Sequence, residues 1–345
     1  MKKLLLLLFI GYTANAMADK LYIEPFSIEY GETKQIAINL EMTENTYRAV
    51  QFDLFLPDGI SIAKNNKNRY IWSLNEDRID EHTIVGDINE GGYYTFAIYS
   101  TANGAILREE DGALLYITIK ASAQISTGNT EGYIRNQNLA ISATESTFPT
   151  DENFIVTGSI NTTVTTLGYA SFSWPKALDF TNSGLTAYIA TSYANNSLHL
   201  ESVTKVPANT GLILKGTAGS ENTYPLETTD DETLDDVNGN MLTSNTTGIY
   251  TVSTNNVYVL SNLDNGMPGF YIADTGVNIG QYKSFLVLSE DPTRKGLAFD
   301  EVPAGIQTVG TADAAPYKWY DLQGRRVEQP TKGVYVVNGT KRIVK

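Results

Sequence analysis

Cysteine is absent from the 345 residues, and only two histidines occur, His82 and His199. The chain therefore cannot form disulfides, use thiol chemistry or be anchored through an acylated cysteine, so its stability must come from burial. Neither histidine lies in a metal-type spacing such as H-x-x-x-H, and no G-x-S-x-G elbow or phosphate-binding glycine loop occurs. A catalytic pair of carboxylates, as in glycosidases, is the kind of site hardest to exclude, but no sequence pattern singles out two of the 39 acidic residues. We predict that the protein is not an enzyme and has no catalytic residue, no metal site and no cofactor.

Hydrophobic runs of membrane-spanning length are also missing. The Leu-rich run at residues 4–10 follows Lys2 and Lys3 and precedes small residues up to position 18. This order of a basic, an apolar and a small-residue region is typical of a secretory signal peptide. We predict a signal peptide at residues 1–18, cleavage after Ala16 or Ala18, and an exported protein with no transmembrane segment.

Positive charge is scarce outside the C-terminus. Without Lys2 and Lys3, 23 basic residues stand against 39 acidic ones, a net charge of −16. Residues 317–345 carry seven basic and two acidic side chains, so the body before them has a net charge of −21. An acidic body argues against nucleic acid as a partner, because phosphates are neutralised by Lys and Arg.

Helical periodicity is nearly absent, and a period of two recurs instead. Short turn signals such as Leu56-Pro57-Asp58-Gly59 separate the alternating runs. Many short strands with regular turns are typical of sandwiches and barrels, so we predict an all-β fold. The apolar positions expected to face a core are Ile36, Ile38 and Leu40; Val50, Phe52, Leu54 and Leu56; and Ala113, Leu115, Ile117 and Ile119, while Gln35, Asp53, Thr118 and Lys120 are expected to point outward.

A first domain is expected at residues 20–160. Its phrases FDLFLPDGI, GYYTFAIYS and DGALLYITIKAS resemble the cohesin-like (Ig-like) β-sandwich. Members of that family hold dockerin modules, and structural relatives include carbohydrate-binding modules. The resemblance implies the sandwich fold only, because the partner-binding face of the family is not a fixed motif.

The last 29 residues, 317–345, predict a short β-meander. An Asn-Gly pair between two strand-like runs is a strong hairpin signal, and it occurs here between residues 334–337 and 341–344. The order and spacing of this segment resemble the C-terminal sorting tail of type IX secretion cargo, which implies recognition at the outer membrane of a diderm bacterium; an ordinary terminal hairpin is the alternative. The residues that carry the resemblance are Tyr320, Asp321, Gly324, Arg325, Lys332, Gly333, Tyr335, Asn338, Gly339 and Lys341.

A second β-rich domain is expected at residues 161–302, followed by a linker of small residues at 303–316. Strand-like runs recur at 167–180, 185–192, 203–216, 257–262, 269–273 and 282–288. The domain resembles a β-rich repeat found upstream of such sorting tails, for which no defined activity follows.

Aromatic residues give the remaining functional signal. Sugar-binding modules use exposed rings as platforms for pyranose faces, although most Tyr in β-proteins cover half-buried edges. The candidate ligand-binding residues are Trp72, Trp174, Tyr93 and Tyr94. Acidic loops leave Ca²⁺ open as a ligand, but Asp236-Val237-Asn238-Gly239 lacks the middle ligand and closing Glu of a calcium loop.

The sequence thus favours a secreted or cell-surface, non-catalytic binding or adhesion protein of a diderm bacterium. The sandwich would bind a polysaccharide or an extracellular protein, and the tail would engage the outer-membrane secretion machinery. Two alternatives stay open: a cohesin-like scaffold module that docks a protein, and an accessory domain protein of an extracellular glycoside hydrolase system.

Overall fold

The computed structural model describes residues 19–43, 45–107, 112–194, 196–262, 268–289 and 295–300, and the backbone of four short strands between residues 319 and 344. The predicted all-β class is confirmed: the only helix among these residues is a short 3-10 helix, η1 (Glu76–Arg78). In the same described part, no helix is long and apolar enough to cross a membrane. The chain divides into two compact units, residues 1–300 and 301–345. The predicted signal peptide, residues 1–18, lies outside the described residues.

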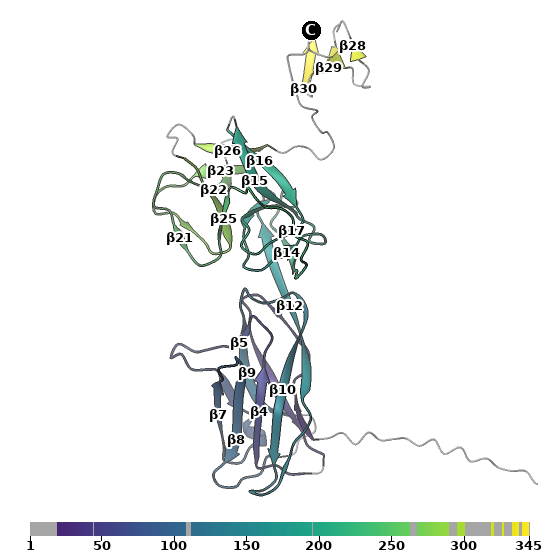
Figure 1. Cartoon of the computed structure of the whole chain (residues 1–345), viewed down its shortest axis with the longest axis vertical. Coiled ribbons are helices and arrows are strands. Elements are labelled where there is room, and N and C mark those ends of the chain that lie inside the picture. Colours follow the sequence, from purple (N-terminus) through teal and green to yellow (C-terminus); the bar gives the residue numbers. More distant parts are fainter. Residues whose placement is uncertain are drawn as a thin grey trace, which may run out of the picture. The chain divides into compact units, whose positions relative to one another are not determined.

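Two sheets form the N-terminal sandwich (Figure 1). The smaller has the order β1-β3-β9-β5, with β6 also paired to β9; its strands are β1 (Lys20–Tyr22), β3 (Thr33–Glu41), β5 (Ile60–Ile62), β6 (Trp72–Leu74) and β9 (Gly112–Ala121). The larger has the order β17-β14-β19-β12-β10-β4-β8-β7, with β11 on β10 and β2 parallel to β12. Its strands are β2 (Phe26–Glu29), β4 (Ala49–Phe55), β7 (His82–Ile88), β8 (Tyr94–Ser100), β10 (Gly128–Ala140), β11 (Ser146–Thr147), β12 (Glu152–Val164), β14 (Leu178–Asp179), β17 (Lys205–Val206) and β19 (Asn222–Thr228).

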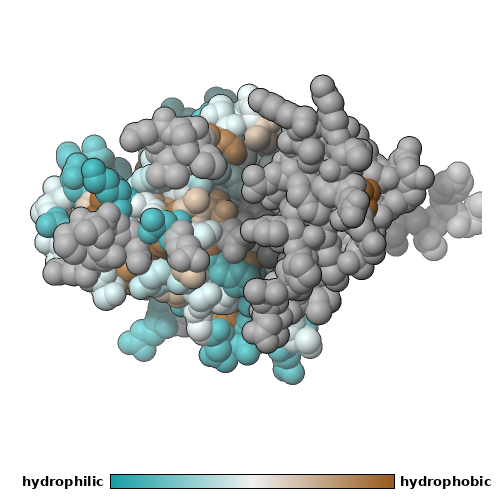
Figure 2. All heavy atoms as spheres, turned by 90° about the horizontal axis from the view of Figure 1, so that it is seen from above, coloured by the Kyte–Doolittle hydropathy of each residue, from teal (hydrophilic) through white to brown (hydrophobic). Residues whose placement is uncertain are grey.

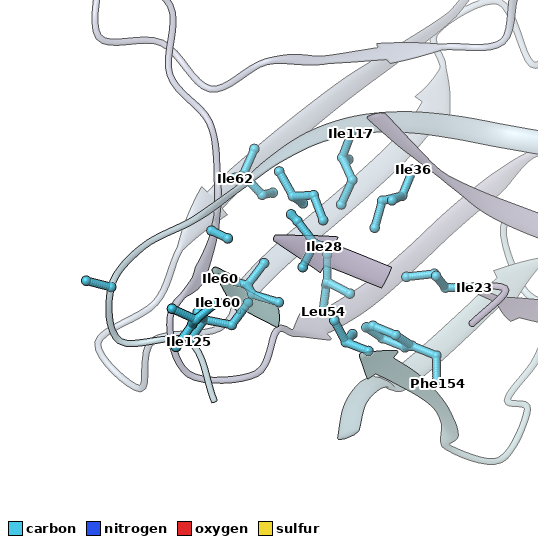
Figure 3. Packing of buried hydrophobic residues seen from close by; sticks show 14 of the residues in the cluster. Ile23, Ile28, Ile36, Leu54, Ile60, Ile62, Ile117, Ile125, Phe154 and Ile160 are labelled. Atoms are coloured by element: carbon cyan, nitrogen blue, oxygen red, sulfur yellow. The ribbon is translucent and has the colours of Figure 1, made fainter. Parts of the chain in front are cut away.

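The inner faces of both sheets share one hydrophobic core. In Figure 3, Ile36 and Ile117 of the smaller sheet and Leu54 and Phe154 of the larger one point into the same space, around Ile28. Fully burying each such side chain stabilises the fold by about 1.5–3 kcal/mol. Most of the predicted alternation is confirmed, because Ile36, Ile38, Leu40, Val50, Phe52, Leu54, Leu115, Ile117 and Ile119 are all buried.

The alternation fails at Ala113, which is half-buried, while Leu114 and Leu115 are both buried. The register between β3 and β9 shifts between Ile38 and Asn39, so that one extra residue enters the ladder there. Such a bulge reverses which face a side chain occupies. Leu56, one residue past the end of β4, is half-buried and packs against the core, as predicted.

β12 is continuous through residue 160, where the sequence places the end of the first domain. Its first half pairs with β10 and its second half with β19, and Figure 1 shows it leaving the sandwich toward β14 and β17. The sandwich core likewise continues into Val164, Phe172 and Trp174. The division of residues 20–302 into two domains stays a prediction.

Residues 161–300 add a third sheet with the order β13-β18-β15-β16-β26-β23-β22-β25-β20, and a two-stranded sheet of β21 and β24. The strands are β13 (Tyr169–Phe172), β15 (Thr186–Ala194), β16 (Ser197–Val203), β18 (Leu212–Lys215), β20 (Leu242–Asn245), β21 (Tyr250–Thr251), β22 (Val257–Asn262), β23 (Pro268–Ile272), β24 (Asn278–Ile279), β25 (Lys283–Val287) and β26 (Gly296–Asp300). On the face shown in Figure 2, brown hydrophobic areas are separated by hydrophilic ones.

The C-terminal unit holds four short strands: β27 (Trp319–Tyr320), β28 (Arg326–Val327), β29 (Gly333–Val337) and β30 (Thr340–Val344). The predicted terminal hairpin is confirmed, since β29 and β30 pair antiparallel with Val337 opposite Thr340. β28 and β29 both pair with β27, so the order is β28-β27-β29-β30. The predicted linker at 303–316 lies outside the described residues.

Candidate functional site

The outer face of strands β10, β4, β8 and β7 carries the candidate site, and we call it the β4–β8 face. Val50, Phe52 and Leu54 of β4 point into the core, so the intervening residues of that strand point outward. The pairing registers then set four rows of residues across the face. The rows are Ala140, Ala49, Tyr99 and Thr83; Asn138, Gln51, Ala97 and Val85; Arg135, Asp53, Thr95 and Asp87; and Tyr133 with Phe55.

Small side chains in the first two rows leave a depression in the surface. A depression of about 210 Å³ lies there, lined by Ala49, Gln51, Ala97 and Asn138 among others. Tyr99 also lines it and is 39% exposed, while the neighbouring Val85 is 55% exposed. This centre is shallow, carries no charged group, and has large hydrophobic side chains at its rim.

The third row is held by hydrogen bonds centred on Asp53. Its Oδ1 accepts from Thr95 Oγ1 at 2.5 Å, and its Oδ2 accepts from Asn136 Nδ2 at 2.7 Å. Asn89 Nδ2 in turn donates to Thr95 Oγ1 at 2.7 Å. Asp53 points outward, as predicted, but these neighbours cover it and leave it 9% exposed. The network fixes the side chains of Asp53 and Thr95 in this row before any ligand arrives.

Stacked rings and a guanidinium gather around the fourth row, where Tyr93 and the third-row residue Arg135 contact Phe55. The rings of Phe55 and Tyr93 stack with centroids 4.6 Å apart and planes 20° from parallel. Arg135 lies over both Phe55 (5.1 Å) and Tyr133 (4.5 Å), a cation–π arrangement. Tyr133 donates to Glu131 Oε2 at 2.5 Å, and this hydrogen bond raises the pKa of the tyrosine.

The structure brings one of the four predicted ligand-binding aromatics to this face, the half-buried Tyr93. Tyr94, its neighbour in sequence, is buried on the opposite side of the strand, where its hydroxyl accepts from Ile62 N at 3.1 Å. Trp72 is half-buried, stacks on Tyr70 and packs nearly perpendicular to the ring of Phe96. The expectation that Trp174 is an exposed platform is corrected, because the residue is only 3% exposed. Whether Tyr93 or Trp72 binds a ligand stays a prediction.

The predicted sorting residues lie in the C-terminal unit. Tyr320, Gly333, Tyr335 and Lys341 belong to paired strands. The other six lie outside the described residues: Asp321, Gly324, Arg325, Lys332, Asn338 and Gly339.

Metal-ligating side chains do not gather in the described part of the chain, where no group of three or more His, Asp and Glu could hold an ion. His82 has structural partners: its Nδ1 accepts from Asp80 N at 3.1 Å, and its Nε2 lies 3.0 Å from the Arg48 carbonyl oxygen.

Sequence reasoning missed Phe55, Tyr133, Arg135 and Tyr99 as members of one surface. Phe55 could have been found from the sequence, because it continues the alternation that places Gln51 and Asp53 of β4 on the outer face. Its partners on β10 were not visible, because Asn136 sits at φ 52° in a bulge that resets the register between Arg135 and Asn138.

Neither a known protein family nor a curated protein matches this chain. Similar solved structures include a non-cellulosomal cohesin from Archaeoglobus fulgidus, with 12% identity, 40% of this chain and 90% of that one covered, and a TM-score of 0.29. The seventh ScaB type I cohesin from Pseudobacteroides cellulosolvens gives 15% identity, coverage of 41% and 91%, and a TM-score of 0.30.

A third similar structure is the type II cohesin dyad from the adaptor ScaA scaffoldin of Acetivibrio cellulolyticus. It has 9% identity and a TM-score of 0.30, with 64% of this chain and 88% of that one covered. All three TM-scores are low, so these similarities assign no function to the chain.

Proposed function

We propose that this is a non-catalytic, exported binding protein whose sandwich docks another extracellular protein through the β4–β8 face. The observation that carries the proposal is the shape of that face. Its depression of about 210 Å³ is smaller than the roughly 300–1,000 Å³ of small-molecule pockets, and it lies within rows that cross several strands. A broad, shallow surface of this kind suits a partner with a surface of its own.

The composition of the face supports the same conclusion. Protein interfaces are depleted of charge at their centre and enriched in Tyr, Phe and Arg. Here the uncharged centre of Ala49, Ala97 and Gln51 lies between Tyr99 and the group of Phe55 and Arg135. Tyr and Arg are the residue types that most often dominate binding energy when a partner covers them.

Glycan binding is the second candidate, and the fourth row favours it. The parallel rings of Phe55 and Tyr93 are the kind of aromatic group that packs on apolar faces of sugar rings. In that case the protein is an adhesin for polysaccharide, or an accessory component of an extracellular glycoside hydrolase system.

Export and attachment complete the proposal. The signal-peptide pattern at residues 1–18 supports export, and the order of residues in 317–345 supports recognition by an outer-membrane secretion machinery. The protein would then be released or attached at the outer surface of a diderm bacterium. Mass spectrometry of native surface and medium fractions tests this: full-length protein that retains residues 1–18 and Lys345 in the cytoplasm or periplasm would contradict it.

The docking proposal is tested first by finding the partner. A photo-crosslinking amino acid in place of Tyr99, in the full-length exported protein, should capture one extracellular protein; the same amino acid in place of Gln35, an exposed residue of β3 in the other sheet, should not. The captured protein is then purified and titrated calorimetrically against wild type, A97R and Q35R.

We expect A97R to weaken this binding at least about tenfold, or 1.4 kcal/mol, because a long charged side chain fills the depression. Q35R should bind as wild type. Equal affinity of A97R and wild type for the captured protein would show that the β4–β8 face is not the docking site. Retention on polysaccharide gels that is lost in Y93A but kept in A97R would favour the glycan candidate instead.

A further inference from the structure

A second cavity is lined by residues from the ends of β12 and β13 and from strands β22, β24 and β25. It shares no lining residue with the depression in the β4–β8 face. Its volume is about 300 Å³, at the lower end of the range for small-molecule sites. Val259, Val277, Ile279 and Ala170 give it an aliphatic wall. Thr163, Ser171 and Asn278 add hydroxyl and amide groups to its lining. Thr165 and Ser284 also line it, but their hydroxyls donate to the carbonyl oxygens of Tyr169 and Leu212.

The lining of this cavity carries a positive charge, whereas the chain as a whole has a net negative charge. The whole sequence has 39 acidic and 25 basic residues, yet no carboxylate lines the cavity and one lysine, Lys283, does. Lys283 has no ion pair among the described residues. Lys283 is exposed to solvent, yet the protein around its ammonium lowers the pKa of that group by desolvation. A cation in this setting gains from an anionic ligand that replaces lost hydration.

The backbone around Lys283 is fixed by buried polar side chains. Ser173 Oγ donates to the Lys283 carbonyl oxygen at 3.0 Å. Asn245, directly opposite Lys283 in the β20–β25 pairing, donates through Nδ2 to the carbonyl oxygens of Gly280 (2.9 Å) and Ile279 (3.2 Å). These bonds hold two cavity-lining segments together, so the cavity exists before a ligand binds.

We propose that this cavity binds a single carboxylated sugar, a uronic acid residue. Its carboxylate would pair with the Lys283 ammonium in a charge-assisted contact. Its ring C–H groups would pack on Val259, Val277 and Ile279, and its hydroxyls would meet Thr163, Ser171 and Asn278. The proposal does not depend on the β4–β8 face.

The test is a calorimetric titration of the full-length mature protein with D-galacturonate, D-galactose and inorganic phosphate. We expect millimolar or tighter binding of galacturonate, about −4 kcal/mol or better, and at least tenfold weaker binding of galactose and of phosphate. K283Q should weaken galacturonate binding at least tenfold, while K120Q, an exposed lysine of β9, should not change it.

A170L provides a second variant that does not touch the charge. Ala170 is 4% exposed and lines the cavity, so a larger side chain should occupy ligand space and lower affinity; thermal melting checks that this variant folds. Equal affinity in wild type and K283Q, equal binding of galactose, equal binding of phosphate, or no binding of galacturonate would each overturn the proposal. A97R should bind galacturonate normally, which separates this outcome from that of the docking test.

Discussion

Tyr30 and Trp174 pack edge to face, with ring centroids 4.8 Å apart and planes at 90°. Tyr30 follows β2 of the sandwich, whereas Trp174 follows β13 of the third sheet. Tyr282 closes the group, at 5.5 Å from Tyr30 and 4.7 Å from Trp174. These three rings therefore tie residues of the sandwich to residues 161–300 through aromatic contact.

Two replacements of Trp174 should separate the stability that its ring contributes by packing from the cost of its buried indole N–H. The indole Nε1 is buried and has no hydrogen-bond partner among the described residues. We expect W174A to lose about 3–5 kcal/mol of unfolding free energy. W174F should lose clearly less, because it keeps a ring at this site and removes an unsatisfied donor that costs about 1–3 kcal/mol. Urea unfolding measures both variants, and equal losses would show that the ring contact contributes little.

The local part of this fold could be predicted from sequence, because alternation and turns act over a few residues. The run Val50, Phe52 and Leu54 was predicted to be buried and is buried. The turn at Pro57 and Gly59 is confirmed, with Ile60 N donating to the Pro57 carbonyl oxygen at 3.1 Å. Each of these features depends on its own segment alone.

The sites depend on distant partners, and sequence reasoning found only part of them. Trp174 lies beside a turn in the sequence, but Tyr30 and Tyr282 cover it in the fold. Tyr93 was identified, yet its partner Phe55 lies on another strand. The alternation shows which side of a strand a residue occupies, but not which strand lies beside it or where a bulge resets the pairing.

Tyr30 should make stability fall at alkaline pH. Burial, helped by its hydrogen bond and charge interaction with Tyr282, raises the pKa of Tyr30 from 10.0 to about 12. The folded state therefore retains a proton that the unfolded chain releases near its ordinary pKa. This contribution is complete below pH 10 and is lost as pH rises through 12. Unfolding free energies of wild type and Y30F at pH 8, 10 and 11 should diverge in slope; parallel curves would contradict the shift.

Arg78 should be essential to the stability of the sandwich, through hydrogen bonds from its guanidinium to backbone carbonyl groups. It is fully buried and donates to the carbonyl oxygens of Leu107 (3.1 Å), Leu40 (3.1 Å) and Gly112. Because each buried acceptor left unsatisfied costs about 1–3 kcal/mol, we expect R78M to lose at least about 3 kcal/mol. R69M, at an exposed position, should change stability by less than about 0.5 kcal/mol. Urea unfolding of both variants checks the contrast, and similar stabilities would refute it.

Asp19 should contribute stability that acid removes. Its carboxylate accepts from Thr43 N (2.5 Å) and Tyr47 Oη (2.6 Å). Burial raises the pKa of Asp19, but the hydrogen bonds from Thr43 and Tyr47 outweigh that effect and hold it below its ordinary value of 3.8. The contribution is therefore present above pH 3.8 and is lost as pH falls through the lower pKa of the folded state. The stability gap between wild type and D19N should narrow from pH 7 to pH 2; a constant gap would count against the carboxylate.

Gly59 and Gly31 should respond differently to the same substitution. Both have left-handed φ angles, +82° and +80°. A Cβ at Gly59 would lie 2.1 Å from the backbone nitrogen of Ile125, whereas a Cβ at Gly31 would meet no atom within 4 Å. G31A should therefore cost only the backbone strain, about 1–2 kcal/mol. G59A should cost at least about 3 kcal/mol, because the strand-end backbone must also move. Urea midpoints of the two variants give the comparison, and equal losses would place the whole cost in the φ angle.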